Sequence, residues 1–185
     1  MDRRQKKSRE AIFRAFSELL AENNVQHITV GQIIARADVG RATFYAHFET
    51  KEYLLKALSQ ELFCHLFDAI DHRYDHRHIF SCDNPAPAFE HLFFHLKNND
   101  NQLLRLLSGE NADSFLPYFI SGLLTLIENQ KLNFQKPSDL PDDFWHGHIS
   151  AAFVQTLRWW VEHGTVQSPE EITRWFLLSV NCSIV

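Results

Sequence analysis

Apolar residues recur every three or four positions along most of this 185-residue chain, which is the period of an amphipathic α-helix. No segment alternates apolar and polar residues as a strand does, and no segment repeats. The chain is therefore predicted to be all-α, with about nine helices separated by stretches rich in Pro, Gly, Asn and Asp. The predicted helices cover about residues 6–22, 29–37, 41–47, a stretch from 51, a stretch from 88, a stretch around 103–107, 115–127, 142–163 and a stretch from 169, with loops at about 73–87 and 135–141.

The second and third predicted helices are short and lie close together in the sequence, as in a helix-turn-helix. Thr29 and Gln32 have the spacing of a capping box at the start of the first of them. We expect Gly40 to supply the backbone conformation of the turn, and Val39 to be the apolar residue that the turn buries. Because a helix-turn-helix places its second helix in the major groove, this segment indicates DNA binding.

The helix after the turn has an apolar face and a polar face. Phe44 and Phe48 lie four residues apart and are predicted to face the core. Arg41 has the geometry to donate two hydrogen bonds to guanine, Thr43 suits a thymine methyl group or a phosphate, and the aromatic and imidazole groups beside them suit phosphates. The residues expected on or beside the outer face are Arg41, Thr43, Tyr45, Ala46 and His47.

The run Thr43-Phe44-Tyr45-x-His47-Phe48, followed by Lys51-Glu52-x-Leu54, resembles the DNA-binding signature of TetR-type transcriptional regulators. The resemblance covers about residues 8–55, and the rest of the chain is similar to that family in length, helical pattern and an aromatic-rich penultimate helix. Many members have Gly where Asp38 stands and a small polar capping residue where Gly40 stands, so Arg41 is expected to take over part of the DNA contact. The resemblance implies DNA contacts by Thr29, Arg41, Ala42, Thr43, Tyr45, His47 and Lys51.

Charge is distributed unevenly along the chain. Residues 1–50 carry eight Lys and Arg against six Asp and Glu, a net charge of +2, and residues 51–185 carry −7, which gives −5 overall. The basic part is the predicted helix-turn-helix DNA-binding domain, residues 1–50, and residues 51–185 are the predicted ligand-binding and dimerisation domain. The basic start of the first helix either reaches a phosphate or is solvated, and both interpretations stay open for Arg3, Arg4, Lys6, Lys7 and Arg9.

A single helix-turn-helix contacts about half a turn of DNA sequence, and related proteins gain affinity by presenting two such units about 34 Å apart. The sequence is therefore expected to form a homodimer. Trp159 and Trp160 are adjacent, so their side chains point about 100° apart on a helix, and one of them is expected to face a partner helix. The alternative is that the monomer covers both. The predicted dimer interface consists of Trp159, Trp160, Trp175 and Phe176.

Aromatic residues are abundant, with 16 Phe and 4 Trp in a chain that has one Met. This composition predicts a pocket for a small apolar or aromatic effector, and it equally suits a plain aromatic core. The candidate pocket residues are Phe63, Phe67, Phe93, Phe94, Phe115, Tyr118, Phe119 and Phe153.

Two pairs of histidines have the i, i+4 spacing that can present two imidazoles to one metal ion. They are His72 with His76, and His91 with His95. A metal-sensing regulator is the alternative hypothesis, but a solvated loop and a helix edge explain these pairs more simply. The expectation is that the protein has no metal and no cofactor.

Catalytic motifs are missing from the sequence: it has no Gly-rich phosphate loop, no G-x-S-x-G and no H-E-x-x-H, so the chain is not expected to be an enzyme. The three cysteines form no C-x-x-C pair, and no apolar run approaches the length of a membrane helix. These features predict a cytoplasmic protein without membrane contact.

Together these patterns predict a sequence-specific transcriptional regulator that binds a pseudo-palindromic operator in double-stranded DNA. The resemblance implies a repressor that an effector releases from this operator. The alternative is an adaptor or co-regulator whose helical body binds a protein partner.

Overall fold

A computed structural model describes residues 3–70, 87–98, 102–108, 112–129 and 136–180, and within these ranges every regular element is a helix. The predicted all-α fold is confirmed. The helices are α1 (Arg3–Glu22), α2 (Val30–Ala37), α3 (Arg41–His47), α4 (Lys51–Ile70), α5 (Ala88–Asn98), α6 (Gln102–Ser108), α7 (Ala112–Asn129), α8 (Asp142–Glu162) and α9 (Pro169–Val180), with a 3-10 turn, η1 (Val25–His27), before α2. The loop predicted at 73–87 lies outside the described residues except for Pro87. Among the described helices, none combines the length and the apolar character that a membrane crossing requires.

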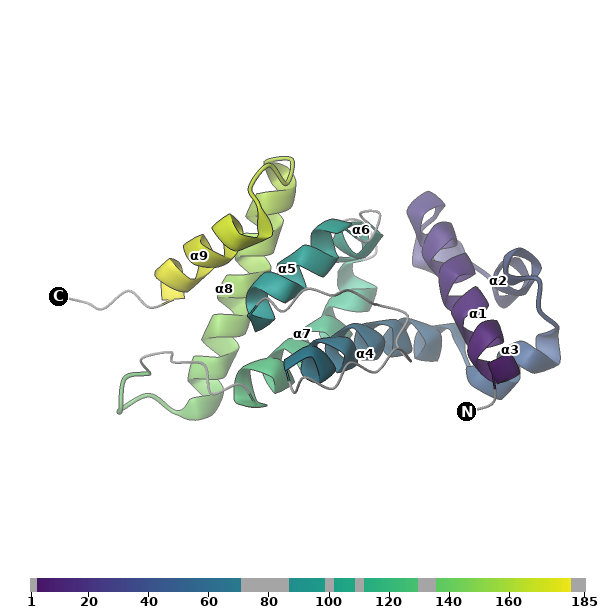
Figure 1. Cartoon of the computed structure of the whole chain (residues 1–185), viewed down its shortest axis with the longest axis horizontal. Helices are drawn as coiled ribbons and strands as arrows, with labels where there is room; N and C mark the ends of the chain where they lie inside the picture. The colour runs from purple at the N-terminus through teal and green to yellow at the C-terminus, as the bar shows by residue number, and fades with distance from the viewer. Residues whose placement is uncertain (1–2, 71–86, 99–101, 109–111, 130–135, 181–185) are drawn as a thin grey trace.

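The helices form an N-terminal unit, α1–α3, and a body, α4–α9 (Figure 1). In the figure, α4 runs from the N-terminal unit into the body beside α7, while α8 and α9 lie at the end of the molecule opposite α1–α3. Arg9 of α1 forms an ion pair of 2.6 Å with Glu61 of α4, and its guanidinium lies 4.6 Å from the centre of the Phe13 ring. Helix α4 therefore links the two parts, and α1 also packs against α6 of the body.

The body is held together by stacked and edge-on aromatic rings. Phe153 of α8 is fully buried, and its ring centre lies 4.7 Å from that of Phe93, 5.3 Å from that of Phe176 and 6.2 Å from that of Phe119. Trp160, two turns further along the inner side of α8, packs edge-on against Phe93 at 5.4 Å. Rings from α5, α7, α8 and α9 therefore meet in one core, where burial and ring contacts reinforce each other.

Helices α4 and α7 approach each other closely at Gly122. A methyl group at this position would come within 2.1 Å of the Phe63 ring of α4, so only a residue without a side chain fits here. The same Phe63 ring packs on Phe119 of α7 at 5.4 Å. This contact fixes the body end of α4 against α7.

Candidate nucleic-acid interface

The start of α2 has the capping box that the sequence predicted. The backbone N–H of Gln32 donates to Thr29 Oγ1 at 3.2 Å, and the backbone N–H of Thr29 donates to Gln32 Oε1 at 2.8 Å. The two residues thus satisfy each other's free backbone donors and fix where α2 begins. The Thr29 hydroxyl, a candidate for DNA contact, is exposed but already takes part in this box.

The turn between α2 and α3 differs from the prediction in the residue that makes it possible. The left-handed conformation belongs to Asp38, with φ 51°, whereas Gly40 has φ −72° and forms the N-cap of α3 without a side-chain hydrogen bond. The expectation that Gly40 supplies the turn conformation was wrong. Asp is one of the few residues that tolerate this region, because its short side chain bonds locally. Val39 is half-buried against the core, as predicted.

Two phenylalanines orient α3. Phe44 and Phe48 are almost completely buried, and Phe48 packs edge-on against Phe13 of α1 at 5.2 Å. Their burial leaves the opposite face of α3 in solvent, where Arg41, Ala42, Tyr45 and Ala46 are exposed and Thr43 and His47 are half-buried. The predicted division of α3 into a core face and an outer face is confirmed.

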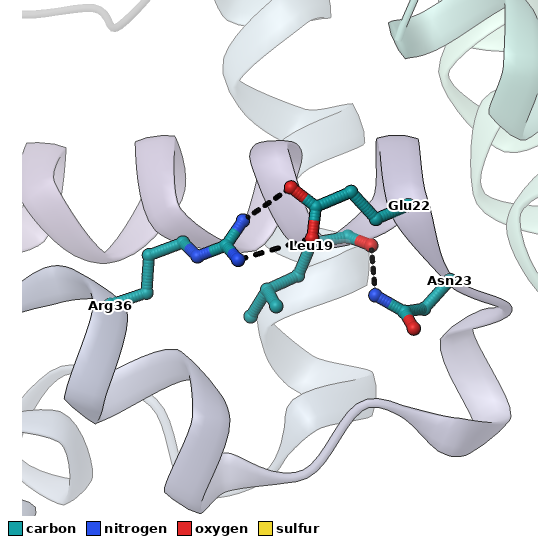
Figure 2. Close-up of polar contacts among 4 residues, drawn as sticks. All are labelled: Leu19, Glu22, Asn23 and Arg36. Carbon is teal, nitrogen blue, oxygen red and sulfur yellow. Dashed lines mark hydrogen bonds and ion pairs between the residues drawn. The ribbon is translucent and has the colours of Figure 1, made fainter.

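Arg41 is the cation of the predicted recognition helix. It is the first residue of α3, it is exposed, and no described residue forms an ion pair with it. Arg36, in contrast, donates to both carboxylate oxygens of Glu22 on α1, at 2.9 and 3.1 Å, and thereby braces α2 against α1 (Figure 2). This hydrogen bond, together with the charge of Arg36, lowers the pKa of Glu22. Asn23, beside this pair in the figure, donates from Nδ2 to the Leu19 carbonyl at 3.2 Å.

Two candidate DNA-contacting residues have partners within the protein. His47 Nε2 lies 2.8 Å from the Ser8 hydroxyl of α1, and burial, with the nearby charge of Arg9, lowers the pKa of His47. Lys51 Nζ donates to the carbonyls of Val25 and Ile28 at 2.7 and 2.9 Å, so it ties the start of α4 to the turn η1. The contact of Lys51 could not be predicted from the sequence, because 23 to 26 positions separate the partners.

Within the described residues, the candidate effector residues divide between a solid core and a cavity. Phe93, Phe115, Phe119 and Phe153 are fully buried, with no solvent-accessible surface, and Phe94 is half-buried. The pocket prediction was wrong for those four, because ring packing fills the volume between their helices. The other three candidates, Phe63, Phe67 and Tyr118, line a cavity of about 520 Å³ between α4 and α7. Polar residues that the sequence analysis missed share this cavity, including Ser59, Gln60 and Thr125.

The candidate interface residues divide between core and surface. Trp160 and Phe176 are fully buried within the monomer, so placing them at an interface was wrong. Trp159 is half-buried and stacks on His163 at 4.1 Å and against Trp175 at 5.7 Å, and Trp175 is 37% exposed. The two adjacent tryptophans do point in different directions, as their spacing predicted.

Comparison with known protein families supports the same interpretation of these elements. A family described as "Bacterial regulatory proteins, tetR family" matches residues 12–58, and one described as "Transcriptional regulator C-terminal region" matches residues 83–181. The chain belongs to the tetR family. The interpretation of this chain as a member of a family of helix-turn-helix transcriptional regulators is thus confirmed.

Individual relatives agree with this assignment. A TetR transcriptional regulator from Streptococcus agalactiae is 31% identical, with 97% of this chain and 96% of that chain covered and a TM-score of 0.72. FadR from Bacillus subtilis, solved in complex with stearoyl-CoA, shares the fold at 19% identity, with 94% and 98% covered and a TM-score of 0.60. The HTH-type transcriptional regulator YxbF of Bacillus subtilis is 28% identical over 96% of this chain, and the chain spans 45% of its length. This TetR-family chain therefore spans less than half the length of the curated relatives that it matches.

Proposed function

We propose that this TetR-family chain represses transcription as a homodimer that binds a pseudo-palindromic operator and that an effector releases. The observation that carries this proposal is the geometry of α3, whose buried phenylalanines hold an exposed face with Arg41 at its first position. A recognition helix enters the major groove with its N-terminal residues foremost, so Arg41 is the side chain best placed for a guanine edge.

Several neighbours of Arg41 suit the DNA backbone. Tyr45 is 47% exposed on the same helix, so its hydroxyl is available to a phosphate, while Thr43 on the same helix is half-buried. Arg3, Arg4 and Lys7 are exposed at the start of α1 and form no ion pair with any described residue. Contacts of this kind position the protein on the duplex, and the base contact of Arg41 gives it sequence preference.

The dimer interface is proposed for the outer side of α8 and α9, which lie far from α1–α3 (Figure 1). Trp159, Trp175 and Leu178 place apolar surface there, and Leu178 is 64% exposed. A two-fold pairing of this face with a second copy would cover it and would leave both α3 helices free for half-sites one helical turn apart. Residues 1–50 then act as the DNA-binding domain and residues 51–185 as the ligand-binding and dimerisation domain.

An organic effector, if it binds the body, has the α4–α7 cavity available. Its walls combine the rings of Phe63, Phe67 and Tyr118 with hydroxyl and amide groups. The charged side chains of Arg9, Lys56 and Glu61 also line it, which suits a molecule with an apolar part and a polar or charged group. FadR, which shares the fold, was solved with stearoyl-CoA, so this fold accommodates a ligand with a long apolar chain. Because α4 also begins at the N-terminal unit, a ligand that favours one position of α4 shifts the population of DNA-competent dimers.

Selection of operators from random double-stranded DNA tests the proposal. The full chain should enrich an inverted repeat, and binding to that repeat should weaken steeply as salt concentration rises. An activity of this kind also places the protein in the cytoplasm, where its DNA target lies. If no repeat is enriched while the protein is folded and dimeric, specific repression is ruled out and the adaptor hypothesis, in which the body binds a protein partner, takes its place.

A further inference from the structure

Three histidines from two helices meet inside the body. His65 lies on α4, and His91 and His95 lie one turn apart on α5. All three are buried, with exposed fractions of 7%, 1% and 6%. The i, i+4 spacing of His91 and His95 is visible in the sequence, where a helix edge was the simpler explanation. Nothing in that spacing connects them with His65, which precedes His91 by 26 positions.

The ring nitrogens of these histidines converge. The Nε2 atoms of His91 and His95 are 3.0 Å apart, and one nitrogen from each of the three rings lies within 4.8 Å of the others. A tetrahedral zinc ion with Zn–N bonds of about 2.0–2.1 Å separates its nitrogen ligands by about 3.3 Å. Side-chain rotations that change the distances between these nitrogens by at most about 1.5 Å would therefore bring all three to ligand positions around one ion.

The chemistry of this cluster suits a metal ion better than an anion. Burial, followed by the charges that the neighbouring imidazoles would carry, lowers the pKa of His91 to about 4 and of His95 to about 3. Neutral imidazole is the form that binds a metal. A simple hydrogen-bonded pair would need only His91 and His95, whereas a third buried imidazole in the same place supplies the third ligand of a three-histidine site.

We propose that His65, His91 and His95 bind a divalent transition metal ion, with Zn²⁺ as the preferred ion. Imidazole ligands favour Zn²⁺, Cu²⁺, Ni²⁺ and Fe²⁺, whereas Mg²⁺ and Ca²⁺ require oxygen ligands, which none of these three side chains offers. Three protein ligands leave a fourth position of the tetrahedron for a water molecule or a small anion.

The site also has a regulatory consequence, which rests on the proposed function. The ion would connect α4 to α5, and α4 is the helix that carries the start of the body at Lys51, directly after the DNA-binding unit. Binding that favours one position of α4 relative to α5 changes the population of DNA-competent dimers by the difference in metal affinity between the two states. The histidine site thus makes a metal ion an effector of operator binding.

Metal titration of the full-length protein, without DNA, tests the site itself. Zn²⁺ competed against a chromophoric chelator should give one ion per chain, and Co²⁺ should give the intense visible absorption of a tetrahedral complex. His65→Gln, His91→Gln and His95→Gln should each weaken Zn²⁺ binding by more than about 100-fold, because even outer partners of metal ligands contribute about 10- to 100-fold. His148→Gln, on the exposed side of α8, is the matched control and should bind Zn²⁺ like the parent chain.

Circular dichroism checks that each variant folds. Because three separate variants are made, the test still works if one of them does not fold. Absence of stoichiometric Zn²⁺ and Co²⁺ binding by the parent chain would overturn the proposal. So would unchanged binding in all three folded variants, or loss of binding only in His72→Gln, which would place the ion at the other histidine pair, outside the described residues.

A second measurement separates the site from its regulatory role. Operator affinity of the parent chain should change by about 5- to 150-fold when Zn²⁺ is added, and the folded histidine variants should show no such change. Stoichiometric Zn²⁺ binding with unchanged operator affinity would overturn the regulatory role and leave the site standing. Failure to bind any operator, with or without Zn²⁺, would instead contradict the proposed function, while the titration without DNA would still decide the metal site.

Discussion

The N-terminal unit and the body of this protein use their aromatic residues in different ways. In α1–α3, a few buried rings such as Phe44 and Phe48 hold a helix whose opposite face stays in solvent. In α4–α9, rings from four helices fill the interior, and Phe153 alone lies near the rings of Phe89, Phe93, Phe119 and Phe176. The candidate chemistry is accordingly on the surface of the N-terminal unit and between helices in the body.

Because of this difference, substitutions in the two regions should separate effects on stability from effects on DNA binding. A side chain on the outer face of α3 contributes little to the fold, so its removal should affect DNA binding alone. A ring in the body contributes through burial and contact, so its removal should lower the free energy of unfolding.

Phe153→Ala should lower the free energy of unfolding by about 3–5 kcal/mol, because it removes a fully buried ring and leaves a cavity among four others. Chemical denaturation followed by circular dichroism measures this change. Phe144→Ala is the matched control on the same helix, since Phe144 is 60% exposed, and it should change stability by no more than about 0.5 kcal/mol. Equal effects of the two substitutions would contradict the picture of a closely packed body.

Lys51→Ala tests whether a candidate DNA contact is mainly a structural residue. It leaves the carbonyls of Val25 and Ile28 without their charged donor, so stability should fall by about 1–3 kcal/mol. Lys56→Ala, an exposed lysine on the same helix, should leave the unfolding curve in place. Weaker operator binding by the Lys51 variant with an unchanged unfolding curve would show that phosphate contact is its main role.

Arg41→Ala should weaken operator binding by about 1–3 kcal/mol and relax the preference for one base pair, while the free energy of unfolding stays the same. Fluorescence anisotropy with the selected operator and its single-base variants measures both effects. Arg158→Ala removes an exposed arginine on α8, far from the N-terminal unit, and should bind the operator like the parent chain. A uniform loss across all DNA sequences would reassign Arg41 to the phosphate backbone.

Arg36→Gln should have the smallest effect, and the effect should depend on pH. The Arg36 hydrogen bond lowers the pKa of Glu22 from its ordinary value of 4.5, so the pair stabilises the folded state above that value and loses its contribution as pH falls through the lower, folded pKa. Thermal melting should therefore separate the parent chain from the variant near pH 7 and bring the two together in acid. Arg14→Gln, on an exposed part of α1, should show no such convergence.

Much of the N-terminal unit was predictable because its signals are local. The capping box of Thr29 and Gln32 lies within one helical turn, and the spacing of Phe44 and Phe48 fixes which face of α3 is buried. The left-handed Asp38 was missed, because a glycine two positions later is the more usual residue for that conformation. The contacts of Lys51 were missed because their partners lie in another element.

The sequence of this protein determined its all-α class, the order of its helices and the division of α3 into two faces, since these depend on the period of apolar residues and on caps within a few positions. Tertiary structure alone decided that Trp160 is core and Trp159 faces outward, that four of the candidate pocket phenylalanines fill a solid core, and that His65 joins His91 and His95. The physical reason is that periodicity shows how residues are arranged around one helix. Which neighbouring helix covers each face depends on close packing between segments that are distant in sequence.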